Sequence, residues 1–209
     1  MKQKIEQFAN SDSYSRLGGS KEKFSVYSKL NPIVSVEDCF DNLLVPRDHP
    51  SRRKQDTYYF DESRVLRTQT SAHQVETIAS GENSFFVFGD VYRRDTVDST
   101  HYPAFHQMEA VRIYDIDSLG VSSKKEAKEM VLEDLKLILI EMARFIFGEV
   151  QYRWNEDYFP FTDPSLELEI LCKNAWLEIL GCGVIHDDVM LNAKRDPNKQ
   201  VGWAFGLGL

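Results

Sequence analysis

Cysteine is scarce in this chain of 209 residues, and no long hydrophobic run occurs in it. Cys39, Cys172 and Cys182 lie too far apart to form a zinc-binding pattern, and an odd number of cysteines argues against a disulfide framework. The longest aliphatic run in the middle of the chain, Leu137 to Ile140, is far shorter than a membrane span. These absences favour a globular protein of a reducing compartment, without structural zinc or a membrane anchor.

Positive charge is also in short supply, because 25 lysines and arginines stand against 33 acidic residues and leave a formal net charge of −8. Affinity for a nucleic acid backbone depends on a concentrated basic surface, so nonspecific binding to nucleic acid is disfavoured. The one compact basic patch, Arg52 to Lys54, fits either a solvated loop or a local contact to RNA. The N-terminal segment contains Glu6 and Asp12 and lacks an apolar centre, so neither a secretory signal nor a transit peptide is visible.

The sequence predicts a short extension followed by one larger domain. Residues 1–22 combine an amphipathic stretch with a serine- and glycine-rich loop that has too little apolar content to pack firmly. Residues 23–209 are long enough for one sizeable domain. Within it, Ser84 to Tyr92 and Ala110 to Ile116 have strand composition, so we expect an antiparallel hairpin with Arg94 to His101 near its tip.

A long helix is predicted from Ser123 to Phe147. Apolar residues recur along it at helical spacing, Ser123 and Glu126 can form a capping box, and Gly148 follows as a stop signal. Three strand-like segments come after the helix, at residues 150–154, 166–172 and 175–180. Strands clustered around one long helix indicate an α+β domain with a mainly antiparallel sheet flanked by helices.

The segment from Gly89 to Glu109 carries the densest chemistry, with two arginines, two histidines, tyrosine, phenylalanine and a Gln-Met-Glu sequence. A guanidinium donates parallel hydrogen bonds to two oxygens of a phosphate or carboxylate, and an aromatic ring nearby can hold a flat base. Arg93 and Arg94 are consecutive, so only one of them can reach a ligand lying on the sheet. The segment therefore indicates a nucleotide whose phosphate is the reacting centre.

On these residues the segment resembles motif 2 of class II aminoacyl-tRNA synthetases, with the closest likeness to organellar, single-chain phenylalanyl-tRNA synthetases. The resemblance implies that Arg93 binds the α-phosphate of ATP and the amino-acid carboxylate, and that His101 contacts phosphate, so these two are the expected catalytic residues. It also implies that Phe105 stacks on adenine and that Gln107 and Glu109 bind the amino acid or the adenine edge. Three neighbours complete the implied ATP-binding set: Thr100, Tyr102 and Met108.

A second block, Leu66 to Gln74, resembles the family segment that binds the ammonium and carboxylate groups of the amino acid. The resemblance assigns amino-acid binding to Ser71, Ala72, His73 and Gln74. Position 69 departs from the family pattern, because glutamine stands where the family usually has histidine. Gln69 can still accept a hydrogen bond, so we expect weaker amino-acid binding rather than lost function.

Two later blocks complete the implied amino-acid pocket. Phe159 and Phe161 flank a proline, and in an extended segment both rings can face the same side and form an apolar slot. By resemblance this pair holds the phenylalanine ring, Glu178 contacts the substrate and Phe205 closes the pocket. The glycines on either side of Cys182 are expected to let a ligand approach the strand backbone closely.

The resemblance covers residues 24–209 and implies a phenylalanine–tRNA ligase. Such an enzyme forms phenylalanyl-adenylate from phenylalanine and ATP with Mg²⁺, and transfers the product to tRNA(Phe) in the mitochondrial matrix or another organelle. The implied partners are phenylalanine, ATP and tRNA, with neither DNA nor a membrane; the organellar type favours a monomer, and no metal-binding residue is assigned. Because the chain ends at Leu209, before the family's motif 3 arginine and anticodon-binding domain, we expect a partial catalytic core with little or no activity.

Two alternatives stay open at this point. One is a related class II synthetase for another amino acid, such as the phosphoserine or pyrrolysine type; the Phe159 and Phe161 pair disfavours an anionic side chain. The other is a noncatalytic relative that binds nucleotide or RNA. Gln69 and the missing motif 3 segment are compatible with this alternative.

Overall fold

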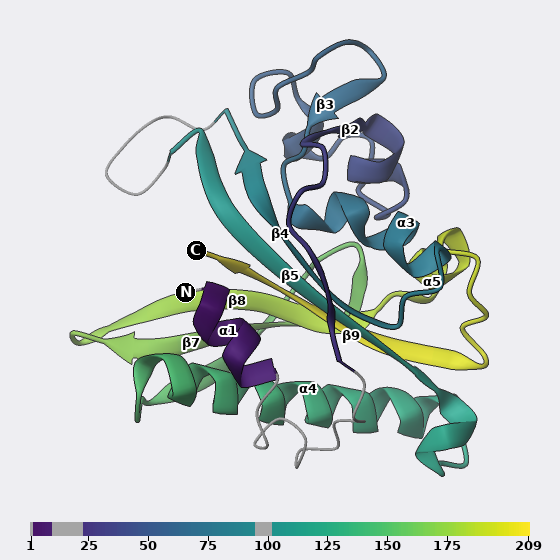
Figure 1. Ribbon diagram of the computed structural model, residues 1–209, viewed down its shortest axis with the longest axis vertical. Helices are drawn as coiled ribbons and strands as arrows, with labels where there is room; N and C mark the ends of the chain where they lie inside the picture. The colour runs from purple at the N-terminus through teal and green to yellow at the C-terminus, as the bar shows by residue number, and fades with distance from the viewer. Residues whose placement is uncertain (1, 10–22, 95–101) are drawn as a thin grey trace.

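One large sheet forms the centre of the computed structural model, which describes residues 2–9, 23–94 and 102–209 (Figure 1). Its seven strands lie in the order β1-β4-β5-β9-β8-β7-β6, and every neighbouring pair is antiparallel except β1 with β4. The strands are β1 (Ser25–Tyr27), β4 (Ser84–Tyr92), β5 (Ala104–Asp115), β6 (Tyr152–Asp157), β7 (Thr162–Cys172), β8 (Ala175–Ile185) and β9 (Gln200–Gly208). The predicted α+β domain with a mainly antiparallel sheet is confirmed.

Helix α4 (Lys124–Phe147) lies across one face of the sheet, with α1 (Lys2–Ala9) beside it (Figure 1). The apolar stripe of α4 is buried against the sheet together with Ile5 and Phe8 of α1, as predicted except for Phe145, which has helical spacing but is exposed. The α4 stripe consists of Ala127, Val131, Leu135, Ile138, Leu139, Met142 and Ala143. At the start of α4, Ser123 Oγ accepts a hydrogen bond from Glu126 N, whereas the Glu126 carboxylate reaches back one residue further than a capping box requires, to Ser122 N.

The opposite face of the sheet is covered by short elements that surround a second core cluster. Helix α3 (Gln74–Ala79) and helix α5 (Asp187–Asn192) pack there, together with a two-stranded sheet (Figure 1). The small sheet pairs β2 (Ile33–Ser35) with β3 (Arg64–Leu66), and the short helical turns are η1 (Glu37–Asp41), η2 (Pro50–Arg52), η3 (Thr70–His73) and η4 (Ile116–Leu119). The Leu66 to Gln74 block, whose composition alone would indicate a loop, starts at the end of β3, is irregular over residues 67–69 and then forms η3 and the start of α3.

The predicted hairpin is present, but its second strand is longer than expected. Strand β5 begins at Ala104, opposite Tyr92 of β4, where the sequence predicted a start at Ala110. Alternation along β5 buries Met108 in the core beneath α4 and turns Gln107 and Glu109 to the other face. The later strands β7 and β8 also extend beyond their predicted ends.

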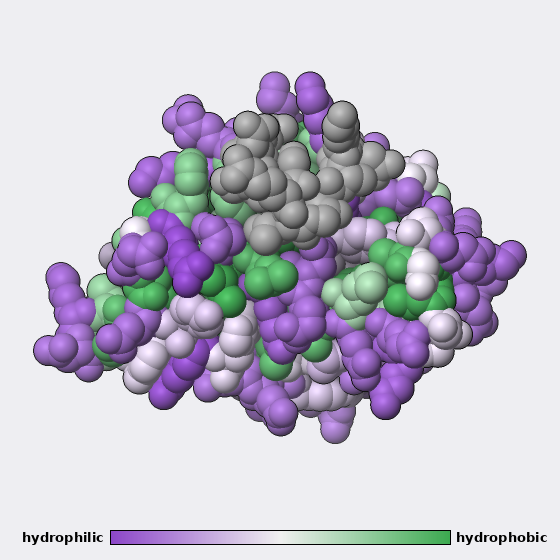
Figure 2. All heavy atoms as spheres, turned by 90° about the horizontal axis from the view of Figure 1, so that it is seen from below, coloured by the Kyte–Doolittle hydropathy of each residue, from purple (hydrophilic) through white to green (hydrophobic). Residues whose placement is uncertain are grey.

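Hydrophilic residues dominate the α4 side of the molecule, with separate apolar patches between them (Figure 2). Among the described residues, no helix combines the length and the apolar character that crossing a membrane requires.

Candidate active site

The described residues enclose a cavity of about 910 Å³ on the sheet face opposite α4. Side chains from β5, β8 and β9 form its floor, and the segment that includes η3, the η2 loop and the turn between β6 and β7 form its walls. The lining residues that the sequence singled out are Gln69, Ser71, Gln74, Arg93, Phe105, Gln107, Glu109, Phe159, Phe161, Glu178, Gly181, Cys182 and Phe205. Segments far apart in the sequence thus converge on one site.

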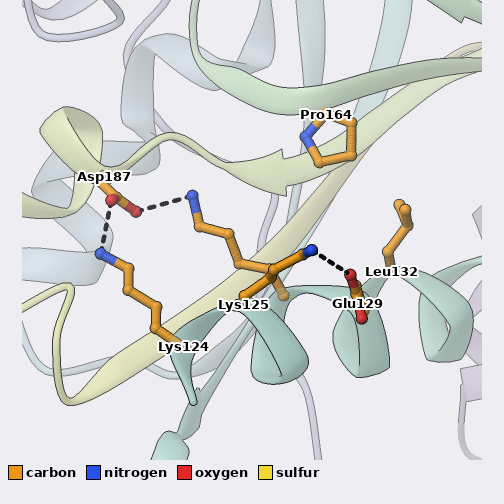
Figure 3. A pocket seen from close by; sticks show the side chains of 7 residues that line it. Lys124, Lys125, Glu129, Leu132, Pro164 and Asp187 are labelled. Atoms are coloured by element: carbon orange, nitrogen blue, oxygen red, sulfur yellow. Dashed lines mark hydrogen bonds and ion pairs between the residues drawn. The ribbon is translucent and has the colours of Figure 1, made fainter.

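A smaller cavity of about 350 Å³ lies at the start of α4 (Figure 3). Its charges already satisfy one another, because Asp187 accepts from Lys124 Nζ at 2.6 Å and from Lys128 Nζ at 3.1 Å. Lys125 lies 3.8 Å from Glu129 one turn along the helix (Figure 3). Neither an aromatic ring nor a buried acceptor lines this cavity, so the larger one is the candidate active site.

Arg93 stands beside an aromatic ring at the end of β4. Its guanidinium carbon lies 5.2 Å from the centroid of the Phe105 ring, and its Nε donates to Thr68 O at 3.1 Å. Arg94 turns away from the cavity, where Nη1 donates to Lys54 O at 2.8 Å. The expectation that only one of the two arginines reaches the ligand side therefore holds, and an anionic group next to a flat ring fits the geometry.

Gln107 and Glu109 connect the sheet to η3. Gln107 Oε1 accepts from Thr70 N at 2.9 Å, which leaves its amide nitrogen for a donor role. The Ser71 hydroxyl donates to Glu109 Oε2 through a short contact, and Gln74 also hydrogen-bonds the Glu109 carboxyl. Among the described residues, Glu109 Oε1 and Gln74 Oε1 are buried without a partner. When Glu109 is ionised, its Oε1 and Gln74 Oε1 are two buried acceptors without a donor, and they suit a ligand with several N–H groups.

Burial controls the protonation of Glu109, whose side chain is fully enclosed although it borders the cavity. Desolvation raises the pKa of Glu109 from 4.5 to about 8, and the hydrogen bonds from Ser71 and Gln74 offset only part of that rise. The carboxyl is therefore largely protonated at neutral pH in the ligand-free protein. A cationic ligand would favour its ionised form.

His73 and Ala72 lie next to the site but do not line it. Ala72 belongs to the core cluster on this face, and His73 Nε2 lies 2.9 Å from Arg67 Nη1. Burial and the nearby Arg67 charge lower the pKa of His73 to about 4, so the ring is neutral. Because a guanidinium can only donate, His73 Nε2 is the acceptor and Nδ1 carries the hydrogen.

Phe159 and Phe161 form a stacked pair in the turn between β6 and β7, with ring centroids 5.9 Å apart and an interplanar angle of 13°. Their segment is a turn rather than the extended stretch that the sequence predicted. Gly181 of β8 lines the cavity, and a Cβ at this position would lie 2.7 Å from the Phe159 ring. Gly181 therefore makes room for the Phe159 ring, while close approach of a ligand to its backbone stays a prediction.

This contact makes a matched pair of glycine substitutions informative. Gly181→Ala should destabilise the chain by about 1–3 kcal/mol, because the new methyl group overlaps the Phe159 ring. Gly206→Ala on the paired strand should cost less, since the nearest atom to its Cβ would be 3.6 Å away. Thermal unfolding of the ligand-free variants checks the difference. Equal melting temperatures would show that the Phe159 ring moves aside freely.

The remaining predicted residues lie at the margins of the site or outside it. Tyr102 is exposed and Met108 is fully buried beneath α4, so neither lines the cavity. Phe205 borders the cavity, although its ring belongs to the core under α4. The centroid of that ring lies 5.9 Å from the centroid of the Trp203 ring. Thr100 and His101 lie outside the described residues.

Sequence reasoning missed one wall of the cavity. Residues of the η2 loop line it, with Asp56 and Thr57 closing that side. The lining residues of this loop are His49, Pro50 and Ser51. Pro46 and Pro50 of this segment favour a rigid turn, but the sequence carries no signal that the turn lies over the sheet. Within the described parts of the chain, no group of three or more His, Cys, Asp or Glu side chains is arranged to hold a metal ion.

The fold and this site define a class II synthetase core. Residues 20–209 match the family profile described as "tRNA synthetases class II core domain (F)", and the chain belongs to this family. The chain is 50% identical over 187 residues to the Arabidopsis thaliana protein named phenylalanine–tRNA ligase, chloroplastic/mitochondrial, covering 90% of this chain and 43% of that protein. It is 44% identical to the Rattus norvegicus mitochondrial phenylalanine–tRNA ligase, covering 89% of this chain and 44% of that one.

The chain therefore spans about half the length of the curated relatives it matches. Among solved structures, pyrrolysyl-tRNA synthetase from Desulfitobacterium hafniense aligns with a TM-score of 0.62 over 99% of this chain and 65% of that chain. Sequence identity to it is 14%, so this likeness shows the fold alone.

Proposed function

We propose that this chain forms the phenylalanine- and ATP-binding core of an organellar phenylalanine–tRNA ligase. One observation carries the proposal: the stacked Phe159 and Phe161 rings share a cavity with two buried, unpartnered acceptors and with Arg93. An apolar slot, an ammonium site and an anion site together match the three parts of phenylalanine. The names of the relatives support phenylalanine over other amino acids and an organelle over the cytosol.

The amino acid would bind by its two ends. The ring of phenylalanine would contact Phe159 and Phe161, and its ammonium group would donate to Glu109 Oε1 and Gln74 Oε1. An apolar slot rejects an added hydroxyl group only weakly, by roughly a hundredfold, so tyrosine should be a detectable wrong substrate.

Activation joins the amino-acid carboxylate to ATP. A carboxylate oxygen attacks the α-phosphorus, the new O–P bond forms, and the bond to the leaving pyrophosphate breaks. Arg93 would neutralise the charge shared by the carboxylate and the α-phosphate, and Thr68 O already fixes its Nε. Phe105 would stack on adenine. Mg²⁺ bound with ATP would neutralise part of the phosphate charge during this step.

Transfer would pass the phenylalanyl group from the adenylate to a terminal ribose hydroxyl of tRNA, with AMP leaving. The basic patch near the η2 loop offers fewer free charges than its sequence suggests. Arg52 is largely buried, pairs with Asp41 at 2.6 Å and lies over the Phe40 ring. Arg53 and Lys54 stay exposed and are the patch residues left for an RNA backbone.

Ligand-induced stabilisation tests the proposed function on the chain as it stands. A nonhydrolysable phenylalanyl-adenylate analogue should raise the melting temperature, since a ligand at 100 times its Kd stabilises the folded state by about 2.7 kcal/mol. A seryl analogue, which cannot fill the Phe159 and Phe161 slot, should give a much smaller shift. Equal shifts, or none from either analogue, would overturn phenylalanine specificity or the site itself.

A further inference from the structure

Arg67 is buried behind the cavity wall and does not line it. Its guanidinium links three separate segments: Nε donates to Asp90 O at 2.8 Å, Nη1 lies 2.9 Å from His73 Nε2, and Nη1 also donates to Leu30 O at 3.4 Å. Among the described residues, no carboxylate forms an ion pair with it. Its partners are carbonyl groups and a neutral imidazole, an arrangement that requires close geometric fit because burying a charge is costly.

Gly89 of β4 completes the seat for this guanidinium. A Cβ at Gly89 would lie 1.8 Å from Arg67 Nη2 and 2.8 Å from its Cζ, so a side chain at this position would expel the guanidinium. Glycine within a strand often marks the close approach of another group. Here the approaching group is Arg67.

The backbone around Arg67 leads directly to the anion site. Arg67 O accepts from Tyr92 N at 2.9 Å, and the next carbonyl, Thr68 O, accepts from Arg93 Nε at 3.1 Å. The Arg67 guanidinium therefore holds the backbone segment that contains Thr68 O against the end of β4, next to Arg93. Turn η3 has an independent attachment, because Thr70 N donates to Gln107 on β5.

We propose that Arg67 is a positioning residue for Arg93: seated over Gly89 and held by His73 and Asp90 O, it fixes the Thr68 carbonyl that orients the Arg93 guanidinium. The ligand side of this inference rests on the proposed function. The positioning itself does not, since it concerns the ligand-free protein. Substitution of Arg67 should disturb the anion site. It should leave the ammonium site nearly intact, because Gln107 and Glu109 connect that site to the sheet.

The ligand-free test follows the Arg93 side-chain Nε–H by NMR hydrogen exchange, with the signal assigned by its loss in Arg93→Lys. Arg67→Lys should speed this exchange at least tenfold. Gly89→Ala, which keeps the arginine but displaces it, should do the same and serves if Arg67→Lys folds poorly. The matched control is Arg195→Lys, because Arg195 also donates two bonds to a backbone carbonyl, Ile78 O, away from the cavity. Unchanged exchange in both Arg67→Lys and Gly89→Ala would overturn the proposal.

Ligand affinity measured below the melting temperature adds a second test, because general destabilisation of the fold would not change it selectively. Arg67→Lys should weaken the phenylalanyl-adenylate analogue about tenfold and phenylalaninol, which lacks the carboxylate, less than twofold. In an Arg93→Ala background, Arg67→Lys should have no further effect, because it acts through Arg93. Equal weakening in both backgrounds would refute that route. If the wild-type chain binds neither probe, the proposed function fails, while the exchange experiment still decides the role of Arg67.

Discussion

Arg93→Ala should weaken binding of the phenylalanyl-adenylate analogue by about a hundredfold or more, the largest binding loss that we expect from a single substitution. Arg93 is the arginine that lines the cavity, and its Nε is already fixed by Thr68 O. Removing one preorganised donor from an oxyanion site typically costs about 3–4 kcal/mol. Isothermal titration calorimetry of the folded chain measures this loss of affinity for the analogue. The effect on aminoacylation can be measured in a preparation that is active in that reaction.

Arg94→Ala is the matched control for this substitution. It removes the same side chain one residue further along, where the guanidinium donates to Lys54 O and lies over the Tyr58 ring instead of facing the cavity. Binding of the analogue should change less than threefold, an expectation based on the usual size of surface effects. Comparable losses in both variants would mean that general positive charge, rather than the placement of Arg93, binds the ligand.

The hairpin shows what the sequence could and could not predict. Strand β4 was predicted at its observed bounds, Ser84 to Tyr92, because its aromatic and branched residues are buried on both faces. The start of β5 was placed six residues too late, since β5 begins at Ala104 rather than Ala110. The missed portion holds Gln107 and Glu109, which face the cavity. Polar side chains that serve a site break the hydrophobic pattern from which strands are recognised.

The direction of each side chain was a second feature that the sequence did not predict. The family resemblance supplied a run of neighbours on β5, but a strand turns successive side chains to opposite faces, which separates Met108 from Gln107 and Glu109. The same alternation places the Phe205 ring in the core under α4. Contacts between distant segments, such as Gly181 with Phe159 or Gly89 with Arg67, had no signal in a single sequence.

Glu109→Gln should change how stability depends on pH more than any other single substitution at the site. The folded-state pKa of Glu109 is about 8 and the unfolded value is 4.5, so between these limits the folded chain keeps a proton that the unfolded chain has released. Stability of the wild-type chain should therefore fall as pH rises from 4.5 to about 8, and this contribution should level off above pH 8. The total is on the order of 5 kcal/mol at most, at about 1.4 kcal/mol per pH unit.

Denaturant unfolding of both chains across this range isolates the effect, because groups common to both, including His73, cancel in the difference. The glutamine variant should gain on the wild type as pH rises, and parallel curves would refute the assigned protonation. The same proton links stability to ligand binding. An ammonium group beside Glu109 favours the carboxylate, so the analogue should release a proton on binding to the wild type that it does not release from Glu109→Gln. Calorimetry in two buffers of different ionisation enthalpy measures that proton, and equal release from both chains would place the ammonium group elsewhere.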